Sequence, residues 1–228
     1  MYAPSELDVS LLTYEAWLEF WFGQPLLERG ESFAGKYFPD VGPHPVSRPE
    51  CVVEHLKKLC TEFQQIGERY SLPQLNQGIW AMFGAEIELQ KYLWDGRVPI
   101  ERRIRCLASV SVPFSSYVAG HPVKEMENCF YMWWDLVLDS FWIHHGFSPD
   151  YTKLDSEGKD LLDAIFITLK SILESKDERC QYYALHGLGH LHHPSVRAVV
   201  QQYIESNRRQ LDASAIDWLE ECRDGTVM

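Results

Sequence analysis

The stretch ALHGLGHLHHPSV, Ala184–Val196, decides the fold that we expect for this chain. The apolar residues that share one face of a helix within it are Ala184, Leu188 and Leu191. Gly187 and Gly189 leave room for a neighbouring helix to approach closely. Pro194 follows in a turn, and Val196 begins a second apolar series at helical spacing. The stretch therefore predicts a helix, a short turn and a second helix.

Apolar residues follow the same helical spacing along almost the whole chain, and the alternating Val, Ile and Thr runs of strands are absent. We expect an all-α fold in a single domain over residues 1–228, because 46% hydrophobic residues are enough for a sizeable core. The expected architecture is an array of antiparallel helix pairs, an α-solenoid of about nine to ten helices.

The predicted helices cover about 5–22, 49–70, 71–96 as a short pair, 99–118, 125–146, 161–175, 177–191, 195–208 and 212–223. The helix over 125–146 has the widest apolar arc and belongs in the middle of the structure. Residues 23–49 hold five prolines and four glycines, which predicts a long loop.

The charge of the chain limits its partners. A net charge of −12 opposes binding to nucleic acid and to anionic membranes, and it favours a basic protein partner. The only short basic cluster is Arg102, Arg103 and Arg105, which we interpret as an exposed helix face. No apolar run reaches the roughly 18 residues of a membrane span, and the N-terminus does not resemble a secretory signal. We expect a cytoplasmic protein.

Common cofactor and nucleophile motifs are missing from the sequence. The six cysteines are scattered without a Cys-x-x-Cys pair, so we expect reduced core residues and no zinc ribbon. Phosphate-binding loops, dinucleotide fingerprints and nucleophile elbows are also absent. We therefore predict no catalytic residue and no cofactor.

Four histidines within the opening stretch raise the question of a metal site. His186 and His190 are four residues apart and share one helix face, and His193 could supply a third imidazole from the turn. The stretch is not His-Glu-x-x-His, and exposed or packing histidines are the commoner explanation. We assign no metal ligand and retain all three histidines as candidate partner-binding residues.

Asp135 and Asp139 form a second candidate group. Their spacing of four places both carboxylates on one side of the predicted central helix, where like charges weaken the helix slightly. Paired carboxylates can act as acid and base or bind a metal, but a solvated face explains them as well. We treat both as candidate partner-binding residues.

The segment Glu178–Glu205, with its LGxL ending and following turn, resembles a HEAT-type repeat. Together with QLNQGIWAMFG and FYMWWDLV, it makes residues 70–205 look like an uncharacterised bacterial family of HEAT-like helical proteins that occur near polymorphic toxins. That resemblance implies an immunity role and no catalytic residues to carry over.

Three functions remain open on the sequence. The first is a non-enzymatic immunity protein that binds and neutralises a toxin, since an acidic rigid scaffold attracts a basic partner. The second is a metal-dependent hydrolase or hydroxylase in which folding joins His186 and His190 to Asp135 and Asp139. The third is a helical-repeat adaptor without a toxin partner.

Overall fold

The computed structural model describes residues 8–37 and 46–227, and every regular element in these ranges is a helix. The predicted all-α class is therefore confirmed. The predicted start of the first helix near Ser5 and residues 38–45 of the predicted 23–49 loop lie outside the described residues. The described part of that segment is not all loop, because Phe33–Tyr37 form a short helix.

The α-helices are α1 (Tyr14–Phe22), α2 (Phe33–Tyr37), α3 (Pro49–Thr61), α4 (Phe63–Arg69), α5 (Leu72–Phe83), α6 (Ile100–Ser109), α7 (Ser111–Ser116), α8 (Glu127–His144), α9 (Ser156–Leu173), α10 (Glu178–Leu191), α11 (Val196–Asn207) and α12 (Ala213–Asp224). Short 3-10 turns are η2 (Val9–Leu11), η3 (Leu89–Leu93), η4 (Val118–Gly120), η5 (Lys124–Met126) and η6 (Tyr151–Lys153). The described residues form twelve α-helices, against the predicted nine to ten, and nine of the twelve have nine or more residues.

The helix ends agree best in the C-terminal part, where α10, α11 and α12 lie within a residue of their predicted bounds. The N-terminal helices are more broken than predicted. The predicted 49–70 helix divides at Glu62, and α1 begins only after Thr13, whose hydroxyl accepts a hydrogen bond from the Ala16 amide. Such a capping side chain satisfies a free amide of the first turn and fixes the start of a helix.

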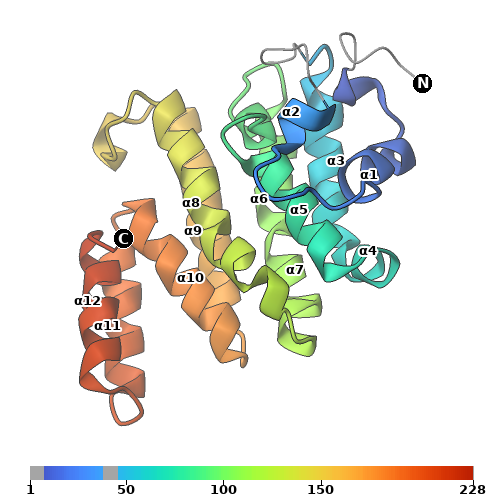
Figure 1. The fold of residues 1–228 in the computed structure, drawn as a ribbon. Helices are drawn as coiled ribbons and strands as arrows, with labels where there is room; N and C mark the ends of the chain where they lie inside the picture. The colour runs from blue at the N-terminus through green and yellow to red at the C-terminus, as the bar shows by residue number, and fades with distance from the viewer. Residues whose placement is uncertain (1–7, 38–45, 228) are drawn as a thin grey trace.

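The N-terminal helices lie at one end of the molecule and the C-terminal helices at the other (Figure 1), and several main contacts join helices that are not adjacent in the chain, such as α3 with α6 and α8 with α10. In the middle, α9 packs against α6 on one side and α10 on the other, and α10 also contacts α8. The α11 and α12 helices lie side by side at the C-terminal end, next to α10. The all-helical packing is clear, and a regular solenoid of antiparallel pairs stays a prediction.

The central position predicted for the 125–146 helix is confirmed by α8, which buries most of its apolar side chains. Gly187 of α10 faces Trp134 of α8 and Leu169 of α9, so that an added Cβ would lie 2.8 Å from both side chains. The predicted role of this glycine in close helix packing is confirmed.

Among the residues described, no helix combines the length and apolar character that a bilayer span requires.

The interpretation of the arginine cluster is wrong for one of its members. Arg102 and Arg105 are exposed, whereas the Arg103 side chain is only 2% exposed. Arg103 lies on the α6 face that packs against α9, one turn before buried Cys106 and Leu107. Its Nη1 donates a hydrogen bond to Glu157 Oε1 of α9 at 2.9 Å. The Glu157 carboxylate thus supplies an acceptor and an opposite charge to the buried guanidinium.

This pair predicts unequal effects of its two partners on stability. Glu157→Ala should lower the free energy of unfolding by about 1–3 kcal/mol, because it leaves a buried guanidinium without its acceptor. Arg103→Met should change it by less than about 1 kcal/mol, because the apolar chain suits the buried site and half-exposed Glu157 regains water. Urea denaturation checks both. Equal losses in the two variants would contradict this account.

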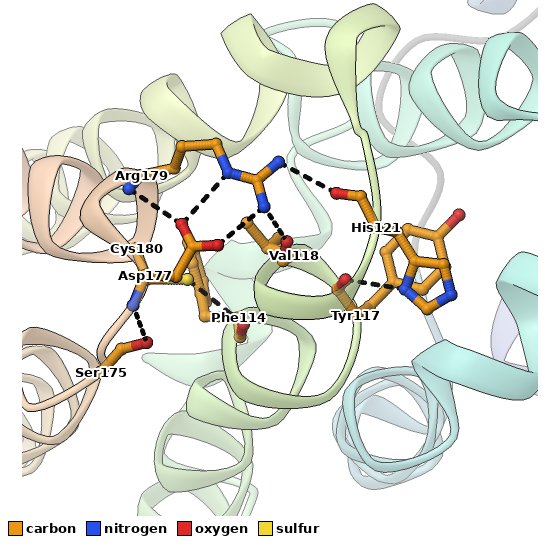
Figure 2. A network of polar contacts seen from close by, with 8 residues as sticks. All are labelled: Phe114, Tyr117, Val118, His121, Ser175, Asp177, Arg179 and Cys180. Atoms are coloured by element: carbon orange, nitrogen blue, oxygen red, sulfur yellow. Dashed lines mark hydrogen bonds and ion pairs between the residues drawn. The ribbon is translucent and has the colours of Figure 1, made fainter.

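The start of α10 is held by a polar network that Figure 2 shows. The Asp177 carboxylate caps α10 by accepting from the Arg179 amide at 2.9 Å, and the Arg179 side chain returns a bond to the same carboxylate. The Arg179 guanidinium also donates to the carbonyls of Val118 and His121. These bonds to Arg179 hold the pKa of Asp177 below its usual value. The network therefore fixes α10 against the η4 turn.

Candidate functional site

Two stripes of side chains face each other across the contact between α8 and α10. Each stripe repeats every four residues and therefore follows one face of its helix. The α8 stripe is Tyr131, Asp135 and Asp139, and the α10 stripe is Tyr182, His186 and His190. An aromatic side chain thus precedes two polar ones on both helices.

Each later residue of the α8 stripe contacts later residues of the α10 stripe. The Tyr131 ring stacks on Tyr182 at 5.2 Å and on His186 at 3.8 Å between centroids. One turn further along, Asp135 Oδ1 lies 2.9 Å from His186 Nε2 and 3.6 Å from His190 Nε2. The two helices therefore run parallel here, with their stripes in register.

Asp135, His186 and His190 each offer one ligand atom to a group in which all three atoms lie within 4.8 Å of one another. His186 is 1% exposed, Asp135 13% and His190 28%, so the cluster opens to solvent on the His190 side. Burial lowers the pKa of His190, which the Asp135 carboxylate opposes. A neutral imidazole with a free nitrogen lone pair is therefore favoured at His190.

Asp139, the other predicted carboxylate, lies one turn beyond Asp135 and is exposed. Partial desolvation and the neighbouring Asp135 charge raise the pKa of Asp139. Its oxygens are not in the three-residue group, although its charge acts on His190. Asp139 thus adds negative potential beside the cluster.

His193 is separated from the other candidate histidines. Its Nε2 lies 3.0 Å from Asp163 Oδ1 of α9, and its ring stacks on Phe166 at 4.3 Å. The Tyr151 hydroxyl donates to the same Asp163 oxygen. His193 therefore ties the turn after α10 to α9 and does not face the Asp135 cluster.

An aromatic ridge, formed by Tyr131, Tyr182 and Trp218, continues from the cluster along the surface. Trp218 of α12 stacks on Tyr182 at 4.6 Å, and Tyr182 keeps 43% of its surface exposed. These three residues were not among those predicted to bind a partner. The four-residue spacing from Tyr182 to His186 and from Tyr131 to Asp135 was a usable signal, whereas Trp218 joins the ridge only through the packing of α12 on α10.

Two grooves flank the aromatic ridge and share Glu178 and Tyr182. The first, of about 650 Å³, lies between α8 and α10, with Lys124, Glu127 and Tyr131 in its walls. The second, of about 450 Å³, lies between α10 and the α11–α12 pair. Its walls include Tyr203, Leu211, Trp218 and Leu219. Both grooves therefore combine aromatic surface with acidic or amide groups.

Of the five residues predicted to bind a partner, the fold brings Asp135, His186 and His190 together, places Asp139 beside them and puts His193 elsewhere. The HEAT-like resemblance and the immunity role stay predictions. Comparison of the chain with protein-family models, with curated proteins and with solved structures gave no match.

Proposed function

We propose that this chain is a binding protein whose aromatic ridge and flanking grooves contact a protein partner. The observation that carries the proposal is the continuous stack of Tyr131, Tyr182 and Trp218, partly exposed between two grooves. Tyrosine and tryptophan supply a large share of binding energy at protein interfaces, because they bury much area with few rotatable bonds. Their gathering on three helices favours such a surface over scattered exposed residues.

The partner suited to this surface is a protein segment rich in Lys or Arg. The net charge of −12 attracts basic partners over long range. Glu127 and Glu178 lie in the wall of the first groove beside Lys124 and Arg179, and Glu178 also lies in the wall of the second groove. The aliphatic part of a Lys or Arg side chain packs on aromatic rings, and its cation is attracted to their faces. A basic segment therefore gains both packing and charge contacts here.

The class of partner follows from the resemblance to toxin-associated HEAT-like proteins. We propose a basic toxin domain as the partner and its neutralisation by occlusion as the outcome. A rigid acidic scaffold supports such a role, because steering speeds the capture of a toxin before it acts. An adaptor that binds another basic protein would use the same surface.

The binding test combines affinity and rescue with the product of a neighbouring gene. The chain should form a stable complex with that product and relieve its toxicity when the two are co-expressed. Trp218→Ala should weaken the complex at least about 30-fold, which corresponds to roughly 2 kcal/mol for a central aromatic contact. The association rate should fall between 0.1 M and 1 M salt, as the Debye length shortens from about 10 to about 3 Å.

The matched control is Phe147→Ala, which removes a 75% exposed aromatic side chain outside the ridge. It should leave affinity unchanged. A complex that tolerates Trp218→Ala but loses affinity with Phe147→Ala would place binding elsewhere. A complex that forms without relief of toxicity supports the adaptor, and the absence of any complex with neighbouring products contradicts the immunity role.

A further inference from the structure

Asp135, His186 and His190 contain buried polar atoms to which no other protein group offers a hydrogen bond. His186 Nε2 is hydrogen-bonded to Asp135 Oδ2 at 3.1 Å. Three other buried atoms of the cluster, Asp135 Oδ1, His186 Nδ1 and His190 Nε2, have no hydrogen-bond partner. Asp135 Oδ1 faces His190 Nε2 at 3.6 Å and lies 2.9 Å from His186 Nε2, whose hydrogen bond goes to Oδ2. Buried polar atoms without partners are uncommon, because they lose their hydrogen bonds to water without gaining others.

Neither neutral form of His190 solves this problem. With a proton on Nε2, the N–H would meet Asp135 Oδ1 at 3.6 Å, which is too long for a hydrogen bond. Without that proton, a nitrogen lone pair would face a carboxylate oxygen, and two acceptors would lie together. A cation between the two atoms would satisfy both at once. His186 Nε2, 2.9 Å from the same Asp135 oxygen, would then become a third ligand, its proton moving to Nδ1 of the same ring or to solvent as the ion binds.

The spacing of the three atoms suits a small divalent ion. With metal–ligand bonds of about 2.0–2.2 Å, tetrahedral ligands lie about 3.3–3.6 Å from one another. The 3.6 Å from Asp135 Oδ1 to His190 Nε2 falls in that range, the 2.9 Å to His186 Nε2 is shorter because the two side chains are in hydrogen-bond contact, and all three ligand atoms lie within 4.8 Å of one another. Only small side-chain movements would separate His186 from Asp135 and admit the ion.

The donor set selects the kind of ion. Two imidazoles and one carboxylate suit Zn²⁺ and neighbouring transition ions, whereas Mg²⁺ and Ca²⁺ prefer oxygen ligands. Water would supply the fourth ligand of a tetrahedral site, as it does where proteins offer three ligands to Zn²⁺. The Asp139 carboxylate, one turn from Asp135, adds a favourable negative potential for a cation.

The fold also holds the ligands in place before an ion binds. His186 and His190 are fixed at a four-residue interval on α10, and His186 is further held by its stack on Tyr131. Gly187, between the two histidines, allows α10 to approach Trp134 on α8 closely. We propose that Asp135, His186 and His190 form a binding site for a divalent transition-metal ion of the Zn²⁺ class, at the junction of α8 and α10.

Zn²⁺ titration of chelator-treated protein tests the site. Calorimetry should show one Zn²⁺ bound per chain, and Co²⁺ should give visible absorption bands of a low-coordinate site. His190→Ala and Asp135→Asn should each lower Zn²⁺ affinity at least about 100-fold, since losing a direct ligand costs more than losing a supporting group. Circular dichroism checks that both variants fold, and Asp135→Asn keeps an oxygen beside His186.

The matched control is His144→Ala, which removes an exposed imidazole from the end of α8. It should leave the stoichiometry and the affinity unchanged. Failure of the parent protein to bind one equivalent of Zn²⁺ would overturn the proposal. So would unchanged affinity in folded His190→Ala, or displacement of Zn²⁺ by equimolar Mg²⁺. Because the readout is metal affinity, the result is independent of any protein partner.

Discussion

Gly187→Val is expected to lower the free energy of unfolding by about 3 kcal/mol or more, at the upper end of the cost of overpacking a core. The added Cβ would lie 2.8 Å from Trp134 Cγ and from Leu169 Cδ2, so both neighbours and the helices that carry them must move. Gly187→Ala should cost less, because alanine recovers up to about 1 kcal/mol of helix propensity. Thermal unfolding should show a loss of about 6–12 °C for the valine variant.

Gly96→Val is the matched control for this prediction. Gly96 lies in the turn before α6, and a Cβ there would meet no atom within 4 Å. The control should change the free energy of unfolding by no more than about 0.5 kcal/mol, as for ordinary surface positions. If both valine variants unfold at the same temperature, the close approach of α10 to α8 and α9 is not what Gly187 provides.

Trp134→Ala is expected to lower the free energy of unfolding by about 3–5 kcal/mol, because it leaves a large cavity at the centre of the helix packing. The Trp134 side chain is fully buried, and its indole nitrogen has no hydrogen-bond partner. The loss is therefore one of packing and apolar burial alone. Urea denaturation measures it, with an unchanged slope showing that the variant still unfolds as a unit.

Trp218→Ala provides the comparison, since Trp218 is only half-buried on the aromatic ridge. Trp218→Ala should lower the free energy of unfolding by less than about 2 kcal/mol, because much of the Trp218 surface is in water in the parent protein.

Gly187→Ala in the Trp134→Ala background should lower the free energy of unfolding by less than Gly187→Ala does alone, because the cavity accepts the new methyl group. A strictly additive double variant would contradict the contact between these two positions.

These packing positions determine the geometry of the candidate site. Gly187 and Trp134 set how closely α10 approaches α8, and Asp135 follows Trp134 directly in the chain. A small displacement of either helix would separate Asp135 from His186 and His190. We therefore expect Gly187→Ala to weaken Zn²⁺ binding at the proposed site even where the variant remains folded. The affinity for the ion would then depend on how closely α8 and α10 pack.

Local spacing in the sequence was sufficient for the helical class and for α10 to α12, whereas α9 begins at Ser156, earlier than the predicted start at residue 161. In α9 to α12 the apolar residues recur regularly, and polar caps such as Asp177 and Asp212 mark where helices begin. The turn of the opening stretch was predicted for the same reason. The N-terminal helices were predicted too long, because the break at Glu62 carries neither glycine nor proline.

Local spacing also placed His186 with His190 and Asp135 with Asp139, since residues four apart share a helix face. Only the tertiary structure decided that the α10 pair meets Asp135, that His193 turns to Asp163 instead, and that Arg103 is buried against α9. These outcomes depend on the register and distance between helices far apart in the chain. Periodicity within one helix tells which residues share a face, and the packing of the whole core decides what that face meets.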